Sequence, residues 1–222
     1  MNILKKLICF SEKTLNLLRD KLSFLGLLGL RVYLAPIMIA AGLTKLNSFE
    51  NTAMWFGNPD WGLGLPMPEV MTGLVIFAEL GGGIALLFGF LTRYFAIPLM
   101  FTMIVAATSV HWDNGWFAIA PSNPSTSMAN PMAMVGIPGA EASLENSAEV
   151  GKRLSAAKSL LKANGNYSWL TEKGNFVVLN NGIEFAVTYF LMLLMLMFYG
   201  GGRYVSVDYW LARMLSKHYG EK

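Results

Sequence analysis

Four ionisable side chains in or beside apolar runs are the residues of this sequence best suited to chemistry. Glu79 is the one charge in the apolar run Val70–Leu91, whereas Lys45, His111 and Glu184 lie at the ends of other apolar runs. A carboxylate at the centre of a bilayer costs about 2.5–3.5 kcal/mol on insertion scales, so we expect Glu79 to be paired, protonated or functional. Glutamate and histidine can both exchange protons when their surroundings bring them near neutral pH. We therefore take Glu79, Lys45, His111 and Glu184 as candidate catalytic residues.

Three further residues could form a ligand surface beside Glu79. Gly82 and Gly83 follow it closely, and their missing side chains let another helix, or a flat ligand, approach the backbone. Arg31 lies about 10 Å inside its own apolar run at 1.5 Å per helical residue, which is too deep for an interfacial position. We predict that Arg31 pairs with Glu79, and we assign Arg31, Gly82 and Gly83 to cofactor binding.

Each of the other three candidate residues also has a structural alternative. Lys45 could extend its side chain to the membrane interface. His111 precedes Trp112 and could be an ordinary interface residue. Glu184 stands three residues after Asn181, the spacing of a helix capping box, in which it would bind backbone instead.

The composition is that of a polytopic membrane protein. Of the 222 residues, 54% are hydrophobic and only 14% are charged, whereas about a quarter are charged in soluble domains. The net charge of +3 comes with no basic patch interleaved with aromatic residues, so we expect no nucleic-acid partner. Cys9 is the one cysteine, which excludes an internal disulfide and CxxC chemistry, and no Cys/His metal motif occurs. Redox chemistry would then need a bound cofactor or a partner.

The apolar runs predict an all-α bundle of four transmembrane helices in the lipid bilayer. Lys and Arg are concentrated in the N-terminus, the turn near Arg93 and the C-terminus, which predicts that both termini are cytoplasmic. The predicted segments are a cytoplasmic amphipathic helix (1–22), transmembrane helices 1–3 (23–111), a periplasmic insertion (112–182), transmembrane helix 4 (183–200) and a cytoplasmic tail (201–222).

The predicted insertion should form a small water-facing subdomain. A helix is expected from about Leu144 to Ala163, and the stretches 167–170 and 175–179 are expected to form a hairpin. The loop 47–69 should form another short hairpin with interfacial tryptophans. Three methionines, Met128, Met132 and Met134, could present thioethers to Cu(I), although methionine is common throughout this chain.

Five separated motifs resemble the DoxX family of four-helix membrane proteins. They are Arg31 with Gly42 and Lys45, the stretches Glu79–Gly82 and Gly89–Arg93, His111, and Glu184 with Gly200–Asp208. The resemblance implies an inner-membrane protein, and some family members resemble the membrane subunit of thiosulfate:quinone oxidoreductases. The long insertion is similar to that of a branch found beside maturation systems for copper-binding modified peptides.

Two functions follow from these residues and from the resemblance. A quinone needs an apolar slot with proton-exchanging groups, which the glycine surface beside Glu79 and His111 offers, so we expect a quinone-linked redox or accessory subunit acting with partner proteins in the membrane or periplasm. The alternative is a non-enzymatic membrane partner in copper-binding peptide maturation or metal handling. Whether the chain is itself an enzyme, and its oligomeric state, stay open.

Overall fold

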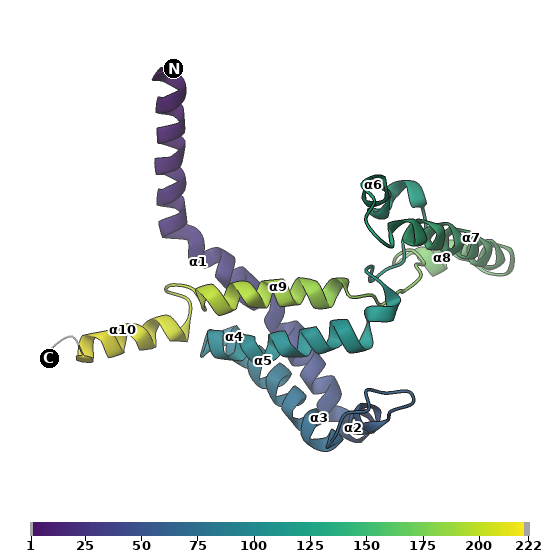
Figure 1. Ribbon diagram of the computed structural model, residues 1–222, viewed down its shortest axis with the longest axis horizontal. Coiled ribbons are helices and arrows are strands. Elements are labelled where there is room, and N and C mark those ends of the chain that lie inside the picture. Colours follow the sequence, from purple (N-terminus) through teal and green to yellow (C-terminus); the bar gives the residue numbers. More distant parts are fainter. Residues whose placement is uncertain (1, 220–222) are drawn as a thin grey trace. The chain divides into compact units, whose positions relative to one another are not determined.

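The computed structural model describes residues 2–219, and the described chain is all-helical (Figure 1). One isolated bridge, between Ile119 and Leu179, is the only β-type pairing within that range. Besides α-helices, the described residues form two π-helical turns (η1 and η2) and two 3₁₀ turns (η3 and η4). The elements are, in order, α1 Asn2–Asn47, α2 Phe49–Gly57, α3 Pro68–Ile76, η1 Phe77–Gly81, α4 Gly82–Phe88, α5 Thr92–Val105, η2 Ala106–Val110, η3 Trp112–Asn114, η4 Pro124–Thr126, α6 Ala129–Met134, α7 Ala140–Asn164, α8 Tyr167–Thr171, α9 Glu184–Tyr199 and α10 Val207–Tyr219.

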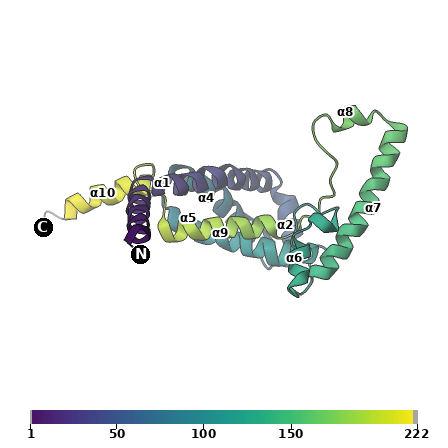
Figure 2. The ribbon, with the colours of Figure 1, turned by 90° about the horizontal axis from the view of Figure 1, so that it is seen from above.

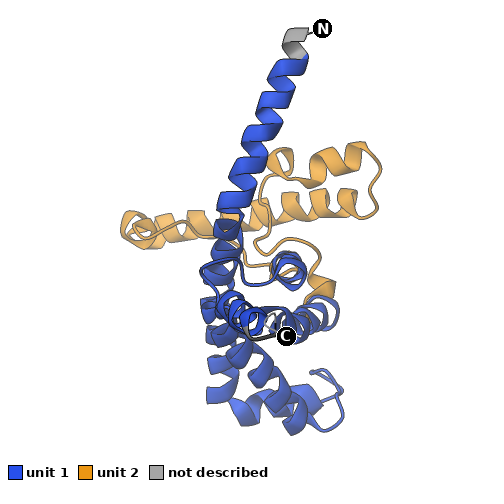
Figure 3. Cartoon of the chain, turned by 90° about the vertical axis from the view of Figure 1, so that its left-hand side faces the viewer, with its two compact units in different colours: residues 1–109, 186–222 blue, residues 110–185 orange. Residues whose placement is uncertain are grey.

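The chain divides into two compact units, which Figure 3 shows in different colours. Unit 1 consists of residues 1–109 and 186–222 and holds most of the apolar helices. Unit 2 consists of residues 110–185 and contains α6, α7 and α8.

Three helical segments are long and apolar enough to cross a membrane. They are Lys5–Asn47, Pro68–Phe88 and Thr92–Val110, so the chain is a membrane protein. Side chains such as Phe77, Tyr94 and Phe101 are more than 60% exposed, as expected where lipid replaces water around the helices. The predicted fourth span corresponds to α9, whose 16 residues are about 24 Å long, shorter than a typical span. A fourth crossing therefore stays a prediction.

The core of unit 1 lies where α1, α4, α5 and α9 meet. Figures 1 and 2 both show α9 running beside α5. The side chains at the centre of this core are almost completely buried: Leu34, Met38, Leu86, Leu99, Leu193 and Leu196. This packing holds the second span against α1 and so positions the ionisable residues of both helices.

Two local predictions are wrong, and a third is confirmed apart from the position of its first residue. The hairpin expected at 167–179 is absent, because the Asn166 side chain accepts a hydrogen bond from the Trp169 amide and starts the short helix α8. The loop 47–69, which was expected to form a short hairpin, contains the helix α2. The helix expected from about Leu144 to Ala163 is confirmed as α7, although it begins earlier, at Ala140, where Gly139 with φ of 82° precedes it.

The N-terminal amphipathic segment is continuous with the first span. Both belong to α1, a single helix of 46 residues that contains Pro36. Whether its first part lies along the membrane surface stays a prediction.

Candidate functional site

A buried ion pair joins the first and second spans. Lys45 Nζ donates a hydrogen bond to Glu79 Oε2 at 2.6 Å. The Glu79 side chain is 5% exposed and that of Lys45 is 27% exposed, so the carboxylate is shielded while the ammonium keeps an open side. Lys45 thus lies with Glu79, and an interfacial position of its exposed side stays a prediction.

Glu79 lies in a π-helical turn. The turn η1 (Phe77–Gly81) separates α3 from α4 and interrupts the α-helical hydrogen-bonding pattern inside the apolar run. π-helical turns are rare, are often found at functional sites, and change the direction in which the following side chains point. The buried carboxylate of the span therefore has a locally distinct backbone as well as a distinct charge.

Glycines allow α1 and the second span to approach closely at this site. A Cβ atom on Gly42 would lie 2.7 Å from the backbone nitrogen of Leu80, the residue after Glu79. A Cβ on Gly83 would lie 2.9 Å from the backbone nitrogen of Ile39. Small residues at such positions are typical of tight helix pairs in membranes.

The sequence allowed either another helix or a flat ligand to pack against Gly82 and Gly83. In the structure, other helices pack against both glycines. A Cβ on Gly82 would lie 2.9 Å from Leu99 Cδ1 of α5, and Gly83 faces α1. A ligand near Glu79 would therefore have to approach from the open side of Lys45 and not along these glycines.

The predicted pair between Arg31 and Glu79 is wrong. Arg31 is 1% exposed and donates to the carbonyls of Leu86 (2.6 Å), Leu87 (2.8 Å), Gly201 (2.7 Å) and Val205 (3.2 Å). Leu86 and Leu87 belong to the last turn of α4, where the helix dipole and unpaired carbonyls favour a cation. Arg31 therefore holds the end of α4 against the loop after α9 and makes no ion pair with a described carboxylate.

Asp208 joins the start of α10 to the turn between α4 and α5. Its Oδ1 accepts from the Leu91 amide (2.6 Å) and its Oδ2 from the Thr92 amide (2.9 Å), at the start of α5. The Asp208 amide donates in turn to the Gly89 carbonyl (2.9 Å). Arg31 and Asp208 thus cap the two helix ends on either side of the α4–α5 turn. The sequence contained both residues but no spacing that assigned Asp208 this role.

Lys45 and Glu79 belong to unit 1 and lie together there, whereas His111 and Glu184 belong to unit 2. His111 Nδ1 is buried and has no hydrogen-bond partner among the described residues. Glu184 Oε2 accepts a hydrogen bond from the Ala118 amide at 2.9 Å, which ties the start of α9 to the preceding loop of unit 2. Their proposed membership in one cluster with Lys45 stays a prediction.

Sequence reasoning missed one further polar residue of the second span. Thr72 is fully buried, and its hydroxyl has no hydrogen-bond partner within residues 2–219. It precedes Glu79 by seven residues, about two helical turns, which is the signal that could have identified it. A buried hydroxyl without a partner is costly and commonly marks a place for water or a ligand.

The pair combines a hydrogen-bond donor and a base. A lysine ammonium has three N–H groups, of which one reaches Glu79 Oε2. Glu79 Oε1 accepts no hydrogen bond from a described residue, so it retains capacity for a proton. The arrangement can bind an oxygen atom through Lys45 and exchange a proton through Glu79.

Comparisons with known proteins agree with these observations. The DoxX family model matches residues 26–112, the part that contains Arg31, Lys45, Glu79 and His111. The chain is 36% identical over 87 residues to "Inner membrane protein YqjF" of Escherichia coli (strain K12), covering 39% of this chain and 62% of that protein. It is 31% identical over 86 residues to "Putative oxidoreductase CatD" of Bacillus subtilis (strain 168), covering 39% of this chain and 60% of that protein. The match spans less than two thirds of either relative, and no solved structure matches.

Proposed function

We propose that the chain is an inner-membrane subunit of a quinone-linked redox system, and the match of the DoxX family model to residues 26–112 supports this. In this proposal the Lys45–Glu79 pair exchanges protons with a bound quinone, and partner proteins supply or receive the electrons. One relative carries the name of an oxidoreductase and another that of an inner-membrane protein, which supports the class and the location.

The observation that carries the proposal is the unequal exposure of the two charges. Glu79 is shielded, with 5% of its side chain exposed, whereas 27% of Lys45 is accessible. An ammonium on the open side can donate a hydrogen bond to a carbonyl oxygen of a ligand, and the carboxylate behind it can take or return a proton.

The residues present fit the headgroup of a quinone. Its carbonyl oxygens need donors, which Lys45 supplies, and the buried Thr72 hydroxyl lacks a partner on the same span. A quinone takes up protons together with electrons, and this is the chemistry it would supply when bound. With a quinone bound, Lys45 would orient its oxygen, Glu79 would hold the proton, and the packing of α1 against the second span would limit the access of water.

The test is the quinone content of the purified protein. Wild type extracted in mild detergent should retain quinone, whereas K45M and E79Q should lose most of it. The matched control is E69Q, because Glu69 is an exposed carboxylate in the first turn of the same span. Retention of quinone by both site variants, or its absence from wild type, would overturn the proposal.

Three exposed methionines support a second candidate function, which is metal handling with a copper-binding peptide. Met128, Met132 and Met134 are 62%, 44% and 79% exposed, in or beside α6. Thioethers prefer Cu(I) over harder ions. A Cu(I) titration of the full chain should show a site that the triple Met→Leu variant lacks if this function applies, and equal binding by the two proteins would exclude it.

A further inference from the structure

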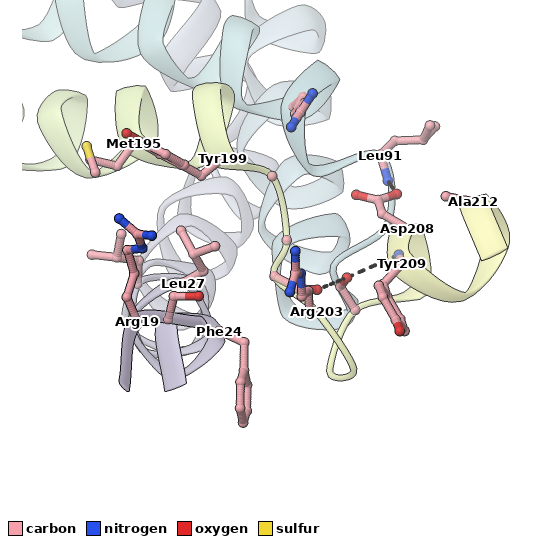
Figure 4. Close-up of a pocket in the computed structure, with 18 of the residues that line it drawn as sticks. Arg19, Phe24, Leu27, Leu91, Met195, Tyr199, Arg203, Asp208, Tyr209 and Ala212 are labelled. Carbon is pink, nitrogen blue, oxygen red and sulfur yellow. Dashed lines mark hydrogen bonds between the residues drawn. The ribbon is translucent and has the colours of Figure 1, made fainter. Parts of the chain in front are cut away.

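A pocket of about 980 Å³ lies in unit 1 at the ends of its apolar helices. Figure 4 shows its walls: Phe24 and Leu27 come from α1, Met195 and Tyr199 from the end of α9, and Arg203 from the loop that follows. Its charged lining residues are Arg19, Asp20, Arg93, Arg203 and Asp208. The pocket is separate from the Lys45–Glu79 pair, which does not line it.

Both carboxylates of this pocket are already engaged. Asp208 accepts hydrogen bonds from the Leu91 and Thr92 amides. Asp20 lies 3.5 Å from its neighbour Arg19, measured between Oδ1 and Nε. Both carboxylates therefore already have hydrogen-bond partners of their own.

Arg93 and Arg203 make no side-chain hydrogen bond or ion pair with any residue in the described range, and both are exposed. Arg93 lies over the backbone of Gly200, because a Cβ placed there would be 3.2 Å from Arg93 Nε. Gly200 has a φ of +75°, so a side chain at this position would be strained as well as crowded. The turn that leads to Arg203 thus leaves room for the Arg93 guanidinium.

The loop after α9, which carries Gly200 and Arg203, is also held by contacts away from Arg93. The positions of Arg93 and Arg203 therefore do not depend on an unsupported chain segment. The Gly201 carbonyl accepts from the buried Arg31, and the Gly200 amide donates to the Leu196 carbonyl at 2.8 Å. A Cβ on Gly202 would lie 3.4 Å from the Leu27 Cβ, which places the loop against α1.

The rest of the wall is apolar and open. Its apolar members include Leu27, Leu30, Tyr94, Met195 and Tyr199. Of these, Tyr94, Met195 and Tyr199 are 71%, 47% and 63% exposed. Aromatic residues at helix ends are typical of the depth at which lipid headgroups lie.

We infer that this pocket binds an anionic phospholipid, with the phosphate between Arg93 and Arg203 and an acyl chain along the wall formed by Leu30, Met195 and Tyr199. Guanidinium groups bind phosphate through paired, charge-assisted hydrogen bonds, and basic pockets between membrane helices bind anionic headgroups in this way. The two arginines without a carboxylate partner favour an anionic ligand, and the adjoining apolar wall favours a lipid over a small free anion.

The test measures lipid retention by the purified full-length protein. Native mass spectrometry with equal amounts of phosphatidylglycerol and phosphatidylcholine should show preferential retention of phosphatidylglycerol by wild type. The double variant R93Q/R203Q should bind it about tenfold more weakly, since several charge-assisted hydrogen bonds are lost. R213Q is the matched control, because Arg213 lies over the Trp210 ring in α10 and does not line the pocket.

Two further measurements separate a lipid from a free phosphate group. M195Q should weaken phosphatidylglycerol binding while leaving both arginines in place, and millimolar inorganic phosphate should compete poorly with the lipid. Equal retention of the two lipids by wild type, or unchanged binding by R93Q/R203Q, would overturn the inference. Complete competition by inorganic phosphate would also overturn it, because the pocket would then be a phosphate site without a lipid component.

Discussion

Lys45 Nζ lies 2.6 Å from Glu79 Oε2, and this contact joins the last turn of α1 to the π-helical turn of the second span. This contact shows which cation balances the buried carboxylate of that span. It leaves Arg31 free for the carbonyls of Leu86, Leu87, Gly201 and Val205. The two buried or half-buried cations of α1 therefore act at different places along the helix.

Breaking the ion pair should affect its two partners unequally. Removal of one partner from a buried pair typically costs about 3–5 kcal/mol, because the other charge is left uncompensated. K45M strands a carboxylate that is only 5% exposed, whereas E79Q leaves a lysine whose side chain is 27% exposed. We therefore expect K45M to lower the thermal stability and membrane abundance more than E79Q does. The double variant K45M/E79Q should recover part of the loss, and strictly additive losses would show that the two charges do not interact.

Replacement of Arg31 by a neutral residue or by lysine should lower the stability of the protein. R31M removes the guanidinium donor from four carbonyl oxygens, of which Leu86 keeps the Gly89 amide, and hydrogen bonds that involve a charged group contribute about 1.5–3 kcal/mol each. R31K keeps the charge but loses the planar fork that reaches both α4 and the loop after α9. Detergent-solubilised R31M and R31K should both unfold at lower temperature than wild type. R19Q is the control, since the Arg19 side chain is 70% exposed, and equal stability of R31K and wild type would refute the capping role.

The glycine contacts between α1 and the second span predict a matched pair of alanine variants. In G83A the new Cβ would meet the Ile39 backbone at 2.9 Å, and overpacking of this kind typically costs about 1–3 kcal/mol. In G73A on the same span no atom lies within 4 Å of the new Cβ. Thermal unfolding should separate the two variants clearly, with G73A close to wild type. Similar melting temperatures would mean that the two helices are not in close contact.

The sequence was sufficient to locate the buried charges but not to pair them. Depths estimated from the helical rise alone predicted that Arg31 and Glu79 could reach each other. Such an estimate places every side chain at the depth of its own Cα. Side chains on a helix lean towards its N-terminus, so Arg31 points to the end of α4 and Lys45 points back towards Glu79. The π-helical turn at Phe77–Gly81 left no signature in the apolar pattern, and the capping role of Asp208 depends on a contact between residues more than 100 positions apart.

Topology can be tested without reference to the site. A reporter fused after residue 222 should be active in the cytoplasm, and a tag inserted within residues 141–148 of α7 should be accessible from outside the cell. The physical reason is the concentration of Lys and Arg at the two ends of the chain and near Arg93. A tag in α7 that is reached only after permeabilisation would contradict the orientation.

The central claim is that Glu79 exchanges a proton with a bound quinone, and infrared difference spectroscopy measures this directly. Electrochemical oxidation and reduction of the quinone-loaded protein should produce a carboxyl signal in wild type. That signal should vanish in E79Q and persist in E69Q, because the exposed Glu69 lies outside the pair. A carboxyl signal that is unchanged in E79Q, or a wild-type spectrum without one, would contradict the account.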